Sequence, residues 1–365
     1  MRYRDPLRQI LSLTKEHWDR DETRPAVRWA FGRAMQCRTP ALGAEVYASE
    51  NEERTFNHTC KSRPCASCGH RSSLQWRRER RSALPNVPYK GITFTMPDVL
   101  WPVFRDNPVL TRALPELAAK VIQIRICLKH SLRVGVIAIP HTFNGKLEFN
   151  SHVHTMVTAG GLRGDEWVPS VFYDRDRLKE SWRRAVIQFL RAALRAGRLR
   201  TSLDANEMEK LLTLQENRWW SVDVKSFASQ QHFLEYAGRY VRRPPIAQRR
   251  ITYIGERTVR FWYNDKLLHH RVYVQYTPEE FVDRWAQHIL ERYRHAVRSF
   301  GLFGPRSIAQ TSAFVFAVLG QEREVRPKPQ RWAAMLIYHF GRDPLLDRFG
   351  ARMKWTRRIR PRVTA

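Results

Sequence analysis

Hydrophobic and polar residues along this chain alternate with two distinct periods. A strict alternation occurs at 92–96, and short runs rich in Val, Ile and aromatic residues occur at 134–140, 152–158 and 250–276. Because successive side chains of a strand point to opposite faces, these runs predict β-strands. Asn144-Gly145 lies between two of the runs and predicts a hairpin turn.

Longer segments repeat their apolar residues every three to four positions, which predicts helices. The clearest lie at 98–133 and 176–198, with shorter ones at 229–242 and 278–300, and a further strand is expected at 218–224. The order lacks regular β-α-β winding. We therefore expect an α+β fold, with an antiparallel sheet that carries its helices on one side.

Three segments of the chain differ in character. Residues 1–84 combine amphipathic N-terminal helices with a polar, cysteine-bearing stretch, residues 85–300 hold most of the strand and helix pattern, and residues 301–365 end in a basic tail. We expect a helical and zinc-binding DNA-binding module, a central α+β domain and a basic helical extension. The tail is expected to be mobile or to bind phosphate.

The composition restricts the kind of partner. The chain has 64 Lys and Arg against 35 Asp and Glu, a formal charge of +29, which makes nucleic acid the expected partner. At 43% hydrophobic residues a sizeable core is expected. A run of about eighteen uncharged apolar residues is absent, which excludes a membrane span. The N-terminus lacks a secretion signal, so we expect a cytoplasmic protein.

Three of the five cysteines lie within nine residues of polar sequence. Cys60, Cys65 and Cys68 have C-x4-C-x2-C spacing, and Cys37 precedes them by 22 intervening residues. Zinc prefers four soft ligands in a tetrahedron, so we expect these four cysteines to form one structural zinc site. Two flanking histidines are alternative ligands, His58 and His70. The fifth cysteine, Cys127, lies in an apolar helical run and is expected in the core.

Two histidines, His152 and His154, alternate with Val153 in a predicted strand. Residues i and i+2 of a strand point to the same face, so both imidazoles project together. They form half of a site for a divalent cation. The sequence leaves the third ligand open among His141, Glu148, Gln231, His232 and Glu235.

Tyr236 and Tyr240 stand one turn apart on the helix expected at 229–242 and border its apolar stripe. The alternative is that both tyrosines only pack against the sheet. If a single tyrosine is a nucleophile we favour Tyr236, because it lies farther from the stripe. Five arginines follow without an acidic residue, a pattern that suits phosphate binding: Arg239, Arg242, Arg243, Arg249 and Arg250.

These features together indicate one chemistry. A phenol has a pKa of about 10 and is a poor nucleophile at neutral pH. It needs an electrophile polarised by a metal, and arginines that stabilise the developing charge. The product would be a phosphotyrosine ester, which keeps the energy of the phosphodiester bond. A DNA 3′-hydroxyl can then reverse the reaction without ATP.

The chain resembles the rolling-circle HUH transposases of bacterial insertion sequences, of the IS91 type and its common-region (ISCR) relatives. The resemblance extends from about Cys37 to Met353. Its most specific match is HTFNGKLEFNSHVHTMVTAGG at 141–161, and YAGRYVRRPPIAQRRI at 236–251 is similar to the tyrosine block of the family. Further similar segments are CRTPALG at 37–43, CKSRPCASC at 60–68, ITFTMP at 92–97 and FGRDPLLDRFGARM at 340–353.

The resemblance implies a transposase that cleaves and rejoins single-stranded DNA at insertion-sequence ends and target through a 5′-phosphotyrosine. It implies a ferredoxin-like HUH domain at 85–300 in a bacterial, nucleoid-associated protein. His152 and His154 would bind Mg²⁺ or Mn²⁺, and Tyr236 and Tyr240 would be the two nucleophiles, one holding the first cleaved 5′ end while the other acts at a second site.

Two segments depart from the family pattern. The family has a C-x2-C-G pair where this chain has EVYASENEERTFNHT, and another where this chain has LLDRFG at 345–350. One zinc site, formed by the four cysteines named above, is therefore expected. Three alternatives to a transposase are a plasmid replication initiator or relaxase of the same chemistry, a non-catalytic zinc-containing DNA-binding protein, and an RNA-binding protein without sequence preference.

Overall fold

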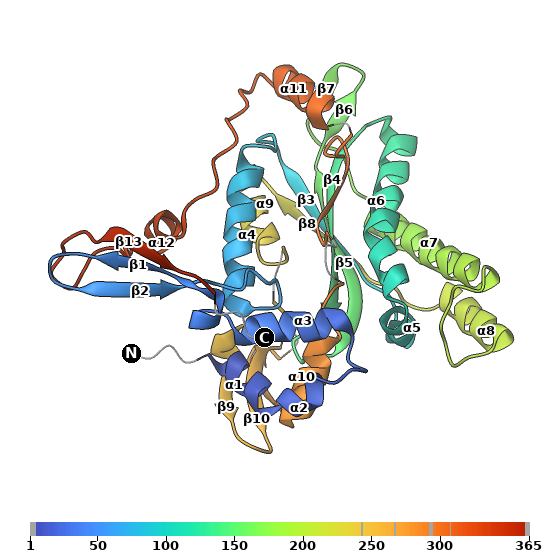
Figure 1. Cartoon of the computed structure of the whole chain (residues 1–365). Helices are drawn as coiled ribbons and strands as arrows, with labels where there is room; N and C mark the ends of the chain where they lie inside the picture. The colour runs from blue at the N-terminus through green and yellow to red at the C-terminus, as the bar shows by residue number, and fades with distance from the viewer. Residues whose placement is uncertain (1–4, 242–243, 266–267, 292–294, 307, 362–365) are drawn as a thin grey trace. The chain divides into compact units, whose positions relative to one another are not determined.

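The structure is a computed structural model that describes residues 5–241, 244–265, 268–291, 295–306 and 308–361 (Figure 1). The chain divides into two compact units. The sheet unit comprises residues 76–241 and 293–326, and the cysteine unit comprises residues 1–75, 242–292 and 327–365. Within the described ranges, none of the helices combines the length and apolar character needed to cross a bilayer.

These two units differ from the three consecutive segments expected from the sequence. The strands at 250–276 and the tail belong to the same unit as the N-terminal segment, and residues 293–326 belong with the central sheet. The difference arises because strand pairing and helix packing join residues that are far apart in the chain. The assignment of DNA binding to residues 1–84 remains a prediction.

The sheet unit is built on a five-stranded antiparallel sheet in the order β12-β4-β5-β3-β8. The strands are β3 (Tyr89–Phe94), β4 (Gly135–Phe143), β5 (Phe149–Thr158), β8 (Val222–Phe227) and β12 (Arg298–Gly301). The β4–β5 hairpin confirms the turn predicted at Asn144-Gly145. There the side-chain oxygen of Asn144 accepts hydrogen bonds from the N–H groups of Lys146 (2.9 Å) and Glu148 (3.0 Å).

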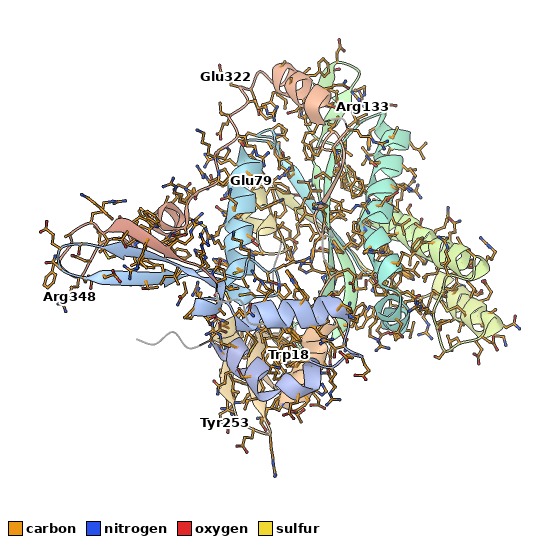
Figure 2. The ribbon with its side chains drawn as sticks, viewed as in Figure 1. Trp18, Glu79, Arg133, Tyr253, Glu322 and Arg348 are labelled. Atoms are coloured by element: carbon orange, nitrogen blue, oxygen red, sulfur yellow. The ribbon has the colours of Figure 1, made fainter. Side chains whose placement is uncertain are left out.

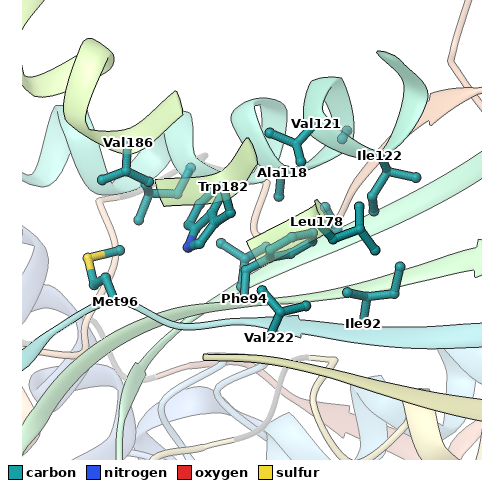
Figure 3. Close-up of a cluster of buried hydrophobic side chains, with 14 of the residues drawn as sticks. Ile92, Phe94, Met96, Ala118, Val121, Ile122, Leu178, Trp182, Val186 and Val222 are labelled. Atoms are coloured by element: carbon teal, nitrogen blue, oxygen red, sulfur yellow. The ribbon is translucent and has the colours of Figure 1, made fainter. Parts of the chain in front are cut away.

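Helices α5, α6 and α7 cover one face of this sheet, and α8 packs on α7. The bounds are α5 (Trp101–Asp106), α6 (Pro108–His130), α7 (Arg175–Arg195) and α8 (Ala205–Glu216). Alternate strand residues, among them Ile92, Phe94 and Val222, meet Trp182 of α7 in a buried core (Figure 3). The Phe94 and Trp182 ring centroids are 5.0 Å apart, and the Trp182 indole N–H donates to the carbonyl of Thr95 (2.7 Å).

The opposite face of the sheet is covered in part by α9 (Gln230–Ala237), so the expectation of helices on one side is wrong. Ile137, Ile139 and Met156 point to this face and are buried against Phe233 and other apolar residues of the second core. Because both faces of the strands carry apolar residues, a single helical layer leaves one face exposed to water. The sheet unit also contains the short pair β6 (Gly161–Arg163) and β7 (Glu166–Val168), and α11 (Ile308–Val318).

The cysteine unit contains a helical cluster packed on a three-stranded sheet. Its helices are α1 (Pro6–Leu13), α2 (Lys15–Trp18), α3 (Pro25–Met35) and α10 (Pro278–Ala286), and its strands are β9 (Ile251–Ile254), β10 (Val259–Asn264) and β11 (Arg271–Tyr276). The three strands confirm the prediction for 250–276. Helix α10 ends at Ala286, well short of the expected residue 300. Helix α4 (Ala66–Arg81) begins in this unit.

A second three-stranded sheet in the cysteine unit joins distant parts of the chain. It has the order β13-β1-β2, with β1 (Ala44–Ala48), β2 (Glu53–Asn57) and β13 (Lys354–Ile359), and α12 (Trp332–Phe340) precedes β13. Neither β1 nor β2 was expected. Within the described residues the tail is a strand, because β13 pairs with β1 and its arginines bind glutamates. The extension expected at 301–365 contains the helices α11 and α12 as well as this strand. Arg357 pairs with Glu53 (2.8 Å), and Arg358 pairs with Glu45 (2.7 Å).

The carboxylate of Asp347 fastens the segment before β13 to the β1–β2 turn. It accepts hydrogen bonds from the side chains of Ser49 (2.7 Å) and Asn51 (2.8 Å), and from the backbone N–H groups of Phe349 (2.9 Å) and Ala351 (2.8 Å). These hydrogen bonds lower the pKa of Asp347 to about 2, and the bond from Asn51 has the largest effect. The two segments that depart from the family's cysteine pattern are therefore joined by hydrogen bonds.

Candidate functional site

The four cysteines expected to bind zinc lie together in the cysteine unit, and all four are buried. The Sγ atoms of Cys37 and Cys68 are 3.8 Å apart, those of Cys60 and Cys68 3.6 Å, and those of Cys65 and Cys37 3.8 Å. A tetrahedral zinc ion with Zn–S bonds of about 2.3 Å separates its sulfur ligands by about 3.8 Å. The spacing of the four sulfurs fits zinc.

The pKa values of the thiols depend on how close the sulfur atoms lie to one another. The pKa of Cys60 and the pKa of Cys65 are both raised, and the largest cause in each case is the neighbouring Cys37 thiol. Several thiolates this close repel one another, and a divalent cation removes that penalty. The alternative ligands are elsewhere. His58 hydrogen-bonds the carbonyl of Leu42 and the carboxylate of Glu45, and the ring of His70 contacts Phe340.

The fifth cysteine, Cys127, is exposed on α6, so its expected place in the core is wrong. The buried residues of α6 near this point include Ile122 and Ile126. Cys127 is about 100° around the helix from Ile126, which directs its side chain outward.

Three histidines of the sheet unit lie together on the face that α9 partly covers. His141 of β4 is directly opposite His152 of β5, and His154 points to the same face two residues further along. One ring nitrogen from each residue lies within 4.8 Å of the others. Among the five residues considered as a third ligand, His141 is the one that joins His152 and His154 in a cluster.

Hydrogen bonds orient the three imidazole rings. Nε2 of His141 donates to the Tyr240 carbonyl (2.9 Å) and Nδ1 of His152 donates to the Asn150 carbonyl (2.8 Å), because a carbonyl oxygen only accepts. Nδ1 of His154 pairs with the Thr93 hydroxyl (3.1 Å). In each ring the other nitrogen is the candidate metal donor. Metal-binding histidines commonly use their second ring nitrogen for a hydrogen bond that orients the ring.

The three histidines form a candidate site for a divalent metal ion. Two ligands with bonds of about 2.1 Å to one ion are at most about 4.2 Å apart, so small ring rotations bring all three nitrogens into range. Neutral imidazoles suit several divalent metals.

Helix α9 ends earlier than expected and places its two tyrosines differently. The helix stops at Ala237, and Tyr240 lies in the turn that follows. Tyr236 is buried, with its ring 4.8 Å from that of Phe227. Tyr240 is half-buried, and its ring stacks on His154 at a centroid distance of 3.8 Å. The structure therefore buries Tyr236 more deeply than Tyr240, although the helical pattern places Tyr236 farther from the apolar stripe.

The two phenols also interact with each other and with the sheet. Their ring centroids are 4.9 Å apart. Burial, more than the hydrogen bond to Tyr240, raises the pKa of Tyr236. The Thr93 hydroxyl hydrogen-bonds His154 and lowers the pKa of Tyr236, so it links one tyrosine to the histidine cluster. Sequence reasoning missed Thr93, although the register of Thr93 opposite His154 follows once β3 and β5 are paired.

The basic segment after α9 is less uniform than its sequence indicates. Arg239 and Arg249 are exposed, as a phosphate contact requires. Arg250 is buried, donates from Nε to the carbonyl of Trp262, and has its guanidinium over the Phe261 ring. Its role in DNA binding stays a prediction. Arg242 and Arg243 lie outside the described residues.

Comparisons with known proteins define the class of protein. A family of transposases, described as "Putative transposase", matches residues 135–310, which include the three histidines and both tyrosines. A second family, "Transposase zinc-binding domain" of the IS91 type, matches residues 9–96, which include the four clustered cysteines.

Individual relatives agree with these families. The chain is 30% identical to the transposase for insertion sequence element IS801 of Pseudomonas savastanoi pv. phaseolicola, over 90% of this chain and 82% of that protein. It is 28% identical to the putative transposase y4qJ of Sinorhizobium fredii, over 78% of this chain and 76% of that protein. The chain belongs to the IS91 family of transposases. No solved structure gives a significant match.

Proposed function

We propose that this transposase cleaves and rejoins single-stranded DNA at insertion-sequence ends through a 5′-phosphotyrosine intermediate. The observation that carries the proposal is the stacking of Tyr240 on His154, inside a cluster of three histidines that suits a divalent cation. Membership of a transposase family makes DNA the partner. It also disfavours a replication initiator or relaxase.

The order of the strands supports a ferredoxin-like HUH core. Apart from the separate β6–β7 pair, the chain from β3 to β8 follows a β-α-β-β-α-β sequence in which each helical step is made of two helices. The strands lie in the order β4-β5-β3-β8. This arrangement is the split β-α-β pattern of ferredoxin-like domains. It brings β3 and β5 to the centre of the sheet, where Thr93 and His154 face each other.

His141, His152 and His154 would hold Mg²⁺ or Mn²⁺. A divalent cation in this position supplies positive charge that withdraws electrons from the scissile phosphate. The backbone carbonyls of Tyr240 and Asn150 fix two of the rings, so the donor atoms are oriented before DNA binds.

The tyrosines supply the nucleophile. The phenolic oxygen attacks the phosphorus, a P–O bond to tyrosine forms, and the bond from phosphorus to the 3′-oxygen breaks. The phenol loses its proton, and the departing 3′-oxygen takes one up to become a hydroxyl. In the reverse reaction a 3′-hydroxyl attacks the phosphotyrosine and rejoins the strand. We propose Tyr240 as the first nucleophile, because it contacts His154 directly and is the more accessible of the two.

The test is a covalent adduct. The protein is incubated with labelled single-stranded oligonucleotides that carry the ends of its own element, with Mg²⁺ or Mn²⁺, and run on a denaturing gel. We expect a slowly migrating band that contains both protein and DNA. Tight binding without any adduct at either end and with either metal contradicts the proposal and favours a non-catalytic DNA-binding protein.

Replacing His141 tests the third ligand. We expect His141→Ala to lower adduct formation at least about 100-fold, because one of three donors is lost. Binding of the oligonucleotide should change little, since basic side chains supply most of the affinity. The matched control is His232→Ala, an exposed histidine of α9. Equal activity of His141→Ala and wild type excludes His141 as a ligand.

Gly91 of β3 tests the placement of Tyr236. A Cβ atom at Gly91 would lie 2.9 Å from Cε2 of Phe227 and 3.2 Å from Cε1 of Tyr236, so a larger residue displaces the phenol. We expect Gly91→Val to reduce Tyr236-dependent strand transfer about 10- to 100-fold. The control is Gly32→Ala, where nothing lies within 4 Å of the added atom. Normal transfer by Gly91→Val contradicts a catalytic role for this position of Tyr236.

A further inference from the structure

The β9-β10-β11 sheet of the cysteine unit has one buried face and one exposed face. On the buried face Val259 and Phe261 lie inside the unit, and the Phe261 ring contacts Phe281 of α10 at 5.8 Å. Helix α1 also packs on β9. Because side chains alternate along a strand, Arg260 and Trp262 point to the other face.

Aromatic side chains gather on the exposed face. Trp262 lies directly opposite Tyr273, and Arg260 lies directly opposite Tyr253. Tyr253 is 52% exposed and Tyr273 is 57% exposed. Figure 2 shows the Tyr253 side chain directed away from the ribbon. Large aromatic side chains this exposed lose hydrophobic stabilisation, which makes a functional contact the better explanation.

Arginines lie among these rings. The Arg271 guanidinium lies over the Trp262 ring at 4.3 Å from its centroid, and the Arg260 guanidinium is 6.0 Å from that of Tyr253. The strands β9, β10 and β11 contain no Asp or Glu. The exposed face therefore combines flat aromatic surfaces with positive charge.

From this combination we infer that the exposed face of the β9-β10-β11 sheet binds single-stranded DNA by stacking bases on Tyr253, Trp262 and Tyr273. Single strands are the nucleic acids whose bases can leave their neighbours and stack on protein rings, and Arg260 and Arg271 match the charge of the phosphates. A protein partner would not require arginines among the aromatic rings of both strand pairs, β9–β10 and β10–β11. The choice of DNA over RNA rests on the proposed function. This face adds a DNA-binding site to the proposed function, because β9, β10 and β11 contain none of the three clustered histidines and neither Tyr236 nor Tyr240.

The inference is tested with the full-length protein. Binding of a fluorescein-labelled oligothymidylate is measured by anisotropy for wild type, Tyr253→Ala/Tyr273→Ala and Tyr253→Phe/Tyr273→Phe. Loss of two stacking rings is expected to weaken binding about 10- to 100-fold, whereas phenylalanine stacks equally and keeps the affinity of wild type. Because stacking is not ionic, the slope of log affinity against log salt should stay unchanged in the alanine variant. Tyr338→Ala, at another exposed tyrosine, is the matched control.

Cross-linking gives an independent readout. Oligonucleotides with 5-iododeoxyuridine should cross-link to peptides that contain Tyr253, Trp262 or Tyr273. Wild-type affinity of the alanine variant together with cross-links elsewhere overturns the inference, and tighter binding of single-stranded RNA overturns DNA as the partner. Cross-links here without a covalent tyrosine adduct would leave this site standing and reject the proposed function. An adduct without cross-links to this face would support the proposed function and reject the binding site on the β9-β10-β11 sheet.

Discussion

Replacing both Tyr236 and Tyr240 with phenylalanine is expected to abolish the covalent protein–DNA adduct. The substitution removes two hydroxyls and keeps both rings, so the stacking on His154 and the packing on Phe227 survive. Loss of a nucleophile lowers the rate roughly 10³-fold or more in enzymes where the rest of the site is intact. The measurement is the yield of adduct on a denaturing gel, with DNA affinity measured in parallel.

The single variants separate the two tyrosines. Tyr240→Phe should remove most of the first cleavage, while Tyr236→Phe should keep it and lose the later strand transfer. Tyr338→Phe, at an exposed tyrosine of the cysteine unit, serves as the control. Normal first cleavage by Tyr240→Phe combined with none by Tyr236→Phe would assign the first step to Tyr236. An adduct formed by the double variant would exclude both.

Loss of the cysteine cluster is expected to have the largest effect on stability. Binding of structural zinc is worth roughly 10–16 kcal/mol, as much as the whole stability of an ordinary domain. We therefore expect Cys65→Ser, or removal of the metal by a chelator, to unfold the cysteine unit. Hydrogen exchange on the full chain should show loss of protection in β1, β2 and β13.

The metal content gives the control for this prediction. Wild-type protein should contain one zinc per chain, and Cys65→Ser should contain almost none. Cys127→Ser changes an exposed cysteine outside the cluster and should keep both the zinc and the melting temperature. A Cys65→Ser protein that melts like wild type would show that the cluster is not needed for folding.

Local patterns predicted much of the sheet unit and one sheet of the cysteine unit. The β4–β5 hairpin, helices α6 and α7 and the strands of 250–276 follow from periodicity and turn residues. The sheet β13-β1-β2 was not predicted, because the pairing of β1 with β13 joins Ala44 to Ile359 across most of the chain. Short strands with few apolar residues carry little periodic signal, and their partners are fixed by contacts that no local window contains.

Only part of the candidate site could be predicted, because some of its residues are brought together by contacts between distant segments. His152 and His154 follow from the two-residue period of a strand, whereas His141 requires the register of β4 against β5. The position of Tyr240 depends on where α9 ends. Gly238 occupies the C-cap of that helix, and a glycine at this point of the sequence is a signal for an early end.

The pairing of β13 with β1 affects how the protein forms during synthesis. The strands β3 to β8 lie within residues 89–227 and can pair as soon as that part of the chain has emerged. Strand β1 emerges early but is the middle strand of its sheet, so one of its edges has no partner until residues 354–359 have been made. An open strand edge can pair with other chains. A ribosome that stops before β13 therefore releases a protein whose histidines and tyrosines are already assembled but whose N-terminal hairpin is prone to aggregate.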